Sequence, residues 1–143
     1  MYKRQGLYGY EMSWPSRLQL GHIATFGTPG FQSWQQEPFQ KYKTALGNYY
    51  AALTTVPSSV SQFNHPGTQY GTFQDFVYSE EADAAVSLME VGTGDDACRY
   101  YIRALDLGWH LAPVNDQTGG RTVVYAESLT EGCLLYTSPS PRD

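Results

Sequence analysis

Short apolar segments alternate with turn residues along most of the chain, and this pattern predicts a series of short strands. Each segment holds apolar or aromatic residues in runs of about four to eight, and most are followed by Gly or Pro. A loop over 115–121 separates the last two. The predicted strands are residues 7–14, 21–26, 60–64, 86–91, 109–114 and 122–126.

Two longer segments have the spacing of helices. In residues 38–53 apolar side chains recur every three or four positions, and Pro57 stands just beyond the expected end. In the second segment Asp95 or Asp96 caps a helix that runs to Leu107. Between these two helices, residues 68–83 are interpreted as a loop with a short helix around 73–78. The order of strands and helices indicates an α/β fold, with mainly parallel pairing through two helical crossovers.

Composition narrows the class of protein. A chain of 143 residues and 16.0 kDa has room for one domain, and a hydrophobic content of 41% excludes a disordered polar tail. No apolar run approaches the ~18 residues of a membrane span. The formal net charge of −5 argues against a nucleic-acid partner, because binding to the phosphate backbone needs a basic surface.

The two ends of the chain resemble translated adaptor sequence rather than natural protein. Residues 133–143 read as a transposon-type sequencing adaptor, and one frame of its reverse complement encodes the Tyr-Lys-Arg of the first five residues. We therefore expect residues 1–5 and 133–143 to be adaptor-derived, with residues 6–132 as a piece of a longer natural protein. Cys98 is then the one cysteine of the natural piece, so no disulfide framework is expected.

Ionisable side chains cluster at the predicted strand ends, where α/β folds bind ligands and metals. Taken singly, each has an ordinary structural alternative: a hydrogen-bonded histidine, a glutamate in a cap or salt bridge, or an aspartate in a turn. A Gly-x-Ser-x-Gly elbow, a Gly-x-Gly-x-x-Gly loop and a Walker loop are all absent from the sequence. The candidates are Glu11, His65, Glu90 and Asp116 at or after strand ends, and His22 and His110 near strand starts.

Several strings together resemble the polymerase and histidinol phosphatase (PHP) family, in its bacterial metallohydrolase branch of secreted or envelope proteins. The resemblance covers about residues 6–131, and Ala-Leu-Asp-Leu-Gly-Trp-His-Leu-Ala-Pro is its most specific string. It implies a distorted (β/α)₇ barrel, here truncated at both ends, that binds two or three divalent metal ions and hydrolyses phosphate esters. The strings are Gly9-Tyr-Glu11, Gly21-His-Ile23, Asn64-His-Pro-Gly67, Met89-Glu-Val91 and Tyr101–Pro113.

By position, the resemblance implies Glu11, His22 and His65 as metal ligands, with Asp116 as a further ligand in one register of the last motif. It implies that Glu90 and His110 orient the ligands rather than bind metal. Imidazole and carboxylate ligands suit Zn²⁺, Mn²⁺ or Fe²⁺. The expected substrate is a small phosphoester, and the implied compartment is secreted or envelope.

Two departures from the family pattern leave a second hypothesis open. The family's first motif, His-x-His, is absent. Its final motif, Asp-x-His, would fall in the loop 115–121, which reads Asn-Asp-Gln-Thr-Gly-Gly-Arg and contains no histidine. The first hypothesis is a piece of a hydrolase whose intact parent activates a metal-bound water, while this chain alone lacks turnover. The alternative is a degenerate, non-catalytic PHP-like domain that binds or supports another molecule in a bacterial envelope protein.

Overall fold

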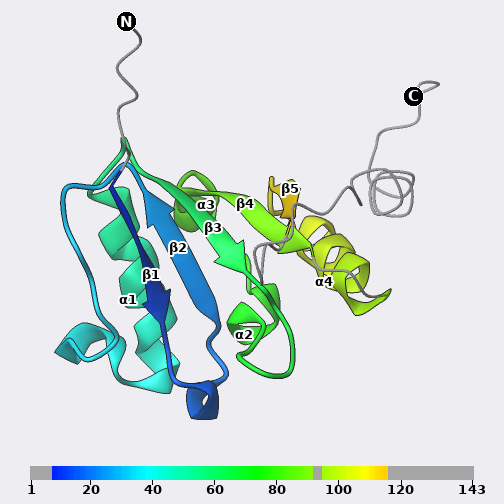
Figure 1. The fold of residues 1–143 in the computed structure, drawn as a ribbon, viewed down its shortest axis with the longest axis horizontal. Helices are drawn as coiled ribbons and strands as arrows, with labels where there is room; N and C mark the ends of the chain where they lie inside the picture. The colour runs from blue at the N-terminus through cyan, green and yellow to red at the C-terminus, as the bar shows by residue number, and fades with distance from the viewer. Residues whose placement is uncertain (1–7, 92–94, 116–143) are drawn as a thin grey trace, which may run out of the picture.

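The computed structural model describes residues 8–91 and 95–115, which form a mixed α/β fold around one five-stranded sheet (Figure 1). Two 3₁₀ turns, at Ser16–Leu18 and Glu37–Phe39, lie in the connections. The elements in chain order are β1 (Gly9–Ser13), β2 (His22–Phe26), α1 (Tyr42–Thr54), β3 (Val60–Asn64), α2 (Phe73–Phe76), α3 (Glu80–Asp83), β4 (Val86–Val91), α4 (Asp95–Asp106) and β5 (Ala112–Asn115).

The strands lie in the sheet in the order in which they occur along the chain. The β3/β4 and β4/β5 pairs are parallel, whereas β1/β2 and β2/β3 are antiparallel. The expected α/β class is therefore confirmed, but the expectation of mainly parallel pairing is wrong for two of the four pairs. The reason lies in the connection through α1: Val60 begins β3 beside Phe26, the last residue of β2. The chain thus returns to the same edge of the sheet and does not cross over.

Alternation along the strands divides the sheet into an inner face, which packs against α1, and an outer face. Tyr10 and Met12 of β1 point inward, while Glu11 and Ser13 point outward. The core on the inner side is aromatic: the Phe63 ring centroid lies 4.2 Å from that of Phe73 and 5.0 Å from that of Trp109. In Figure 1, α1 lies behind β1 and β2 on this inner side.

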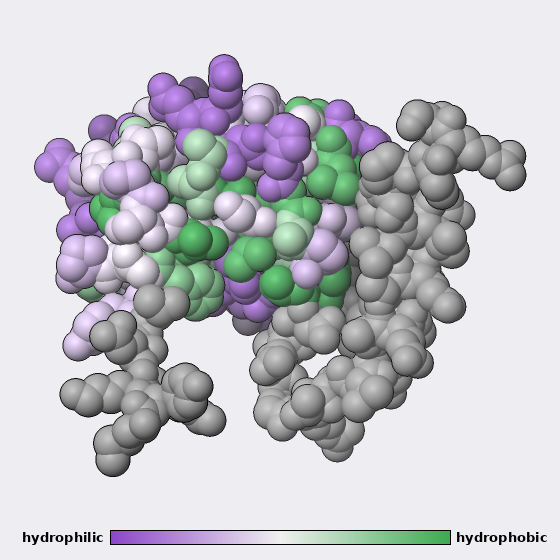
Figure 2. Space-filling view, turned by 90° about the horizontal axis from the view of Figure 1, so that it is seen from above, coloured by the Kyte–Doolittle hydropathy of each residue, from purple (hydrophilic) through white to green (hydrophobic). Residues whose placement is uncertain are grey.

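One end of the sheet has an exposed hydrophobic edge. Phe26 and Val60 are neighbours in register there, and they are 38% and 41% exposed. Viewed from above, hydrophobic residues gather in the middle of the face, among hydrophilic ones (Figure 2). The candidates Glu11, His22 and His65 lie toward the other end of β1 and β2.

The segment between β3 and β4 is a loop with a short helical turn at 73–76, where the sequence pattern predicts one, and a second short helix at Glu80–Asp83, which the pattern does not predict. α2 has positive φ angles of 53–55° throughout, a left-handed turn that costs ordinary residues backbone energy. Its two phenylalanines are fully buried, and the indole nitrogen of Trp109 donates a hydrogen bond to the carbonyl of Phe76. Ser79 caps the start of α3: its hydroxyl accepts a hydrogen bond from the Ala82 amide.

The remaining expectations are met in part or lie outside the described residues. α4 coincides with the expected second helix, and β5 coincides with the end of the expected strand at 109–114. The predicted strand 122–126, most of the loop 115–121 and the adaptor-like segments 1–5 and 133–143 lie outside the described residues. Among the described helices, none combines the length and the apolar character that a membrane span requires.

Candidate metal centre

Three strand termini meet at one edge of the sheet and bring the first three candidate ligands together. In the β1–β2 hairpin Ser13 is the cross-strand partner of His22, and His22 is also the partner of Asn64 in β3. Glu11 shares the outer face with Ser13 because it precedes it by two residues. His65 follows the last residue of β3 directly. The carboxylate and both imidazoles therefore lie on the same side of the same edge.

The ligand atoms of this trio, Glu11, His22 and His65, are close enough to hold one metal ion. Nδ1 of His22 lies 2.8 Å from Nε2 of His65 and 3.4 Å from Oε1 of Glu11. One ligand atom from each of the three side chains lies within 4.8 Å of the other two. The glutamate side chain is 38% exposed and the two imidazoles are partly buried, so one side of the trio is open to solvent.

Each imidazole also has a polar partner outside the trio. Nε2 of His22 lies 3.2 Å from the carbonyl oxygen of Trp14, which can only accept, so Nε2 carries the proton. Nδ1 of His65 lies 3.2 Å from Oε2 of Glu90, at ion-pair distance. Nδ1 of His22 and Nε2 of His65 face each other as a hydrogen-bonded pair 2.8 Å apart, and these two nitrogens are the ones placed to bind a metal ion.

Glu11 is held as a charged carboxylate. Burial raises the pKa of the Glu11 carboxyl, but hydrogen bonds from Ser13 and Asn64, together with the positive charge that His22 and His65 carry when they are protonated, outweigh burial. The net pKa lies below the ordinary value. The Ser13 hydroxyl donates to Oε1 at 2.7 Å, and the Asn64 amide donates to Oε2 at 2.5 Å. The carboxylate is thus both ionised and oriented toward the histidines.

His22 is held as a neutral imidazole, the form that binds metal. Burial lowers its pKa most, and the neighbouring His65 lowers it further. Glu11 and the carbonyl of Trp14 act in the opposite direction without reversing the shift. A metal ion approaching at neutral pH therefore does not have to displace a proton from His22.

Glu90 supports the trio from the next strand. Its Oε2 accepts from the backbone amide of His65 at 2.7 Å as well as facing Nδ1 of the ring. Its Oε1 accepts from the Gln62 amide at 3.3 Å. Glu90 therefore contacts both the backbone and the ring of His65 and positions this histidine from the neighbouring strand.

Tyr70 covers the two imidazoles, and no sequence pattern indicates this role. Its ring centroid lies 4.4 Å from that of His22 and 5.1 Å from that of His65. The Tyr70 carbonyl accepts from the amide of Gly21, the residue before His22. Ser13 and Asn64 were also missed, although their alternation with the inward-facing Met12 and Phe63 places them on the outer face.

A tight loop holds Tyr70 in this position. Gly67 and Gly71 exchange two backbone hydrogen bonds, and Gly71 also bridges to Leu20. Gly71 has a φ of 119°, and a Cβ at this position would lie 2.1 Å from the carbonyl oxygen of Gln19. Only glycine fits here, so the loop that follows His65 is held by its close approach to Gln19, in the segment just before β2.

His110 has its own partner away from the trio. His110 precedes β5, at the edge of the sheet where the parallel strands begin, and its Nδ1 lies 2.7 Å from Oδ2 of Asp83. Its side chain is 84% exposed, so the expectation that His110 orients a metal ligand does not hold. β4 and β5 are parallel, so a residue that precedes β5 lies at the opposite end of the sheet from a residue at the end of β4. This explains why His110 is far along the sheet from Glu90. Asp116 lies outside the described residues.

Comparisons of the chain with protein-family models, with curated proteins and with solved structures find no match. The case for function therefore rests on the geometry of the trio and on the sequence strings.

Proposed function

We propose that residues 6–132 belong to a metal-dependent hydrolase of the PHP type, with Glu11, His22 and His65 as ligands of a divalent metal ion. The observation that supports this proposal is the convergence of two imidazole nitrogens and one carboxylate oxygen within 4.8 Å. Two histidines and one glutamate form a ligand set found in catalytic zinc sites, which keep a further position for water or substrate. The open side at Glu11 leaves room for that position.

The chain's own residues supply orientation and charge around this position. A bound divalent ion would lower the pKa of a coordinated water and stabilise negative charge on a phosphoryl oxygen. Glu90 holds the ring of His65, and the carbonyl of Trp14 holds the ring of His22. Ser13 and Asn64 fix the Glu11 carboxylate. Pre-set ligands bind without a rearrangement, which favours tight and specific metal binding.

The metal identity and the larger architecture are part of the same proposal. Two imidazoles and a carboxylate suit Zn²⁺, Mn²⁺ or Fe²⁺, and a second or third ion needs further ligands, of which Asp116 is a candidate. The parallel β3–β4–β5 segment fits a PHP-type barrel, whereas the antiparallel β1–β2–β3 segment departs from a regular one. We propose a small phosphoester as substrate.

One sequence observation favours a second candidate function. The loop 115–121 lacks the histidine of the family's final motif, which reduces the number of available ligands. A domain that keeps the trio but lacks a second ion would bind metal without turnover. Such a degenerate domain would act as a binding or structural module in a bacterial envelope protein.

The test uses the protein of the intact gene that encodes residues 6–132, with metal content and hydrolysis of p-nitrophenyl phosphate and bis(p-nitrophenyl) phosphate as readouts. Wild type is compared with His65→Ala, and His110→Ala is the matched control because it removes the one histidine outside the trio. We expect bound metal and turnover in wild type and His110→Ala, and neither in His65→Ala. Metal without turnover in wild type would replace the hydrolase with the degenerate domain, and absence of both would overturn the metal centre.

A further inference from the structure

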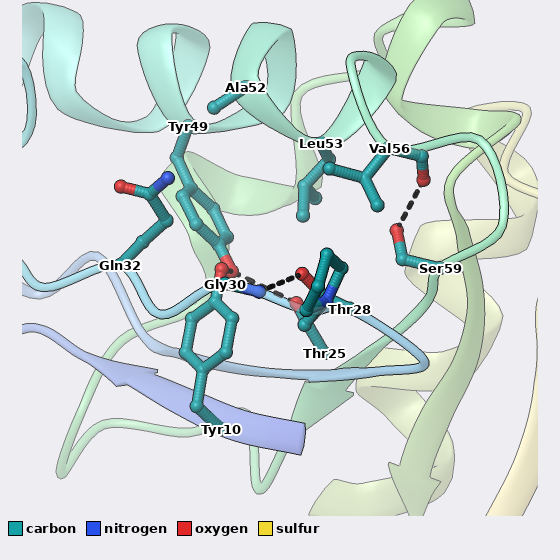
Figure 3. Close-up of a pocket in the computed structure, with 11 residues that line it drawn as sticks. Tyr10, Thr25, Thr28, Gly30, Gln32, Tyr49, Ala52, Leu53, Val56 and Ser59 are labelled. Atoms are coloured by element: carbon teal, nitrogen blue, oxygen red, sulfur yellow. Dashed lines mark hydrogen bonds between the residues drawn. The ribbon is translucent and has the colours of Figure 1, made fainter. Parts of the chain in front are cut away.

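A pocket of about 130 Å³ lies between α1 and the inner face of the sheet, on the opposite side from the trio. The final turns of α1 form one wall, and β1 and β2 form the other (Figure 3). The loop after β2 contributes Pro29 and Gly30, which are exposed, so the pocket reaches the surface there. It is lined by Tyr10, Thr25, Thr28, Pro29, Gly30, Gln32, Tyr49, Ala52, Leu53, Val56 and Ser59.

A chain of four hydroxyl groups runs through the inner face and ends at Tyr10 in this pocket. Tyr49 donates to Tyr10 at 3.0 Å. Because a hydroxyl has one proton, Thr25 must then donate to Tyr49, and Ser61 must donate to Thr25, each at 2.9 Å. Burial raises the pKa of Tyr49, so its proton stays in place as a donor.

Because each hydroxyl in this hydrogen-bonded series donates toward Tyr10, the proton of the Tyr10 hydroxyl is left to donate to a molecule bound in the pocket. Among the described residues, none accepts this proton in a hydrogen bond. Two other hydroxyls of the lining have local contacts: Thr28 accepts from the Gly30 amide, and Ser59 donates to the carbonyl of Val56. In Figure 3 the Tyr10 and Tyr49 rings point toward one another beside Gly30. The Tyr10 hydroxyl is therefore a donor that its bond from Tyr49 leaves available in the pocket.

The rest of the wall is largely apolar, with Pro29, Ala52, Leu53 and Val56 as its hydrocarbon surface. An engineered apolar cavity of about 150 Å³ holds one benzene molecule, so a pocket of about 130 Å³ accommodates a single small ring. We propose that this pocket binds a small neutral molecule, a single ring or short chain of about seven heavy atoms, with one hydrogen-bond acceptor held by the Tyr10 hydroxyl.

This site is independent of the metal centre. Tyr10 and Glu11 are adjacent in β1, and their side chains point to opposite faces of the sheet, so the two sites share strands β1 and β2 but no side chain. Loss of metal binding in a trio variant would leave the pocket intact. Failure of one proposal is therefore distinguishable from failure of the other.

The test compares two probes of similar size on the full chain, followed by NMR chemical-shift changes of the Ala52, Leu53 and Val56 methyl groups. Cyclohexanone carries a carbonyl acceptor, and benzene carries none. We expect both to shift these methyls, with cyclohexanone bound more tightly. Tyr10→Phe keeps the ring and removes the donor, so it should weaken cyclohexanone binding by roughly threefold to tenfold and leave benzene binding unchanged.

A filling variant shows whether binding occurs in the pocket itself. Ala52→Leu adds three carbon atoms to the lining and should abolish binding of both probes, whereas Ala51→Leu, at the neighbouring exposed position, should bind both like wild type. The proposal is overturned if Ala52→Leu binds as wild type does, if neither probe shifts the three methyls, or if Tyr10→Phe weakens both probes equally.

Discussion

The two faces of the sheet use the same strands for different purposes. On the inner face, Met12 and Phe63 are fully buried in an aromatic core. On the outer face, Glu11 and Asn64 stand next to them in the sequence and belong to a hydrogen-bonded polar cluster around His22. The inner side chains stabilise the fold by burial, and the outer ones are held by specific hydrogen bonds. Substitutions on the outer face should therefore affect chemistry far more than stability.

The largest expected effect is on stability and comes from the inner face. Phe63→Ala removes a fully buried ring that packs between Phe73 and Trp109, and should lower the free energy of unfolding by about 3–5 kcal/mol. Gln62→Ala, one position earlier on the outer face, should cost about 1 kcal/mol or less. Urea unfolding of the two variants checks this, and equal losses would contradict the division between the faces.

The next effect is on metal affinity and comes from the outer face. Glu90→Ala removes the carboxylate that faces Nδ1 of His65, so the imidazole loses its fixed orientation. Metal binding should weaken by about tenfold to 100-fold, with urea unfolding of the metal-free chain changed much less. Glu80→Ala, an exposed glutamate in α3, is the control for loss of charge. An unchanged affinity in Glu90→Ala would show that Glu90 does not support the trio.

Two adjacent tyrosines in α1 give a smaller effect of opposite sign. The Tyr49 hydroxyl has two hydrogen-bond partners, so Tyr49→Phe should destabilise the protein by about 1 kcal/mol. The Tyr50 hydroxyl is buried and pairs with none of the described residues. Tyr50→Phe should therefore leave stability unchanged or raise it by up to about 1 kcal/mol. Thermal unfolding measures both, and destabilisation by Tyr50→Phe would reveal a partner for its hydroxyl.

The smallest expected effect is a pH dependence that arises at the trio. The pKa of His22 is lower in the folded protein than its ordinary value of 6.5, mainly through burial. As pH falls through this ordinary value, the unfolded chain takes up the proton first, so stability falls. His22→Ala should flatten the dependence between pH 7.5 and 5.5, and His110→Ala should keep it. Urea unfolding at three pH values tests this, and the idea fails if both variants behave alike.

The sequence pattern predicted much of this structure because burial imposes periodicity on strands and helices. The strands containing Glu11 and His22 and the helix α1 were found in this way. The grouping of Glu11, His22 and His65 was predicted from their positions near strand ends together with the family resemblance. Pairing direction was not predictable, because the spacing within α1 does not say to which edge the chain returns. Tyr70 was missed because it lies in a loop, where position depends on a close approach at Gly71 rather than on periodicity.

Metal binding by Glu11, His22 and His65 is the proposal on which the others depend. It is tested by calorimetric titration of the metal-free chain with Zn²⁺ and with Mn²⁺ at pH 7.5. We expect one ion per chain in wild type and in His110→Ala, and loss of this binding in His22→Ala and in His65→Ala. Absence of binding in wild type, or a loss in His110→Ala equal to that in the trio variants, would contradict it.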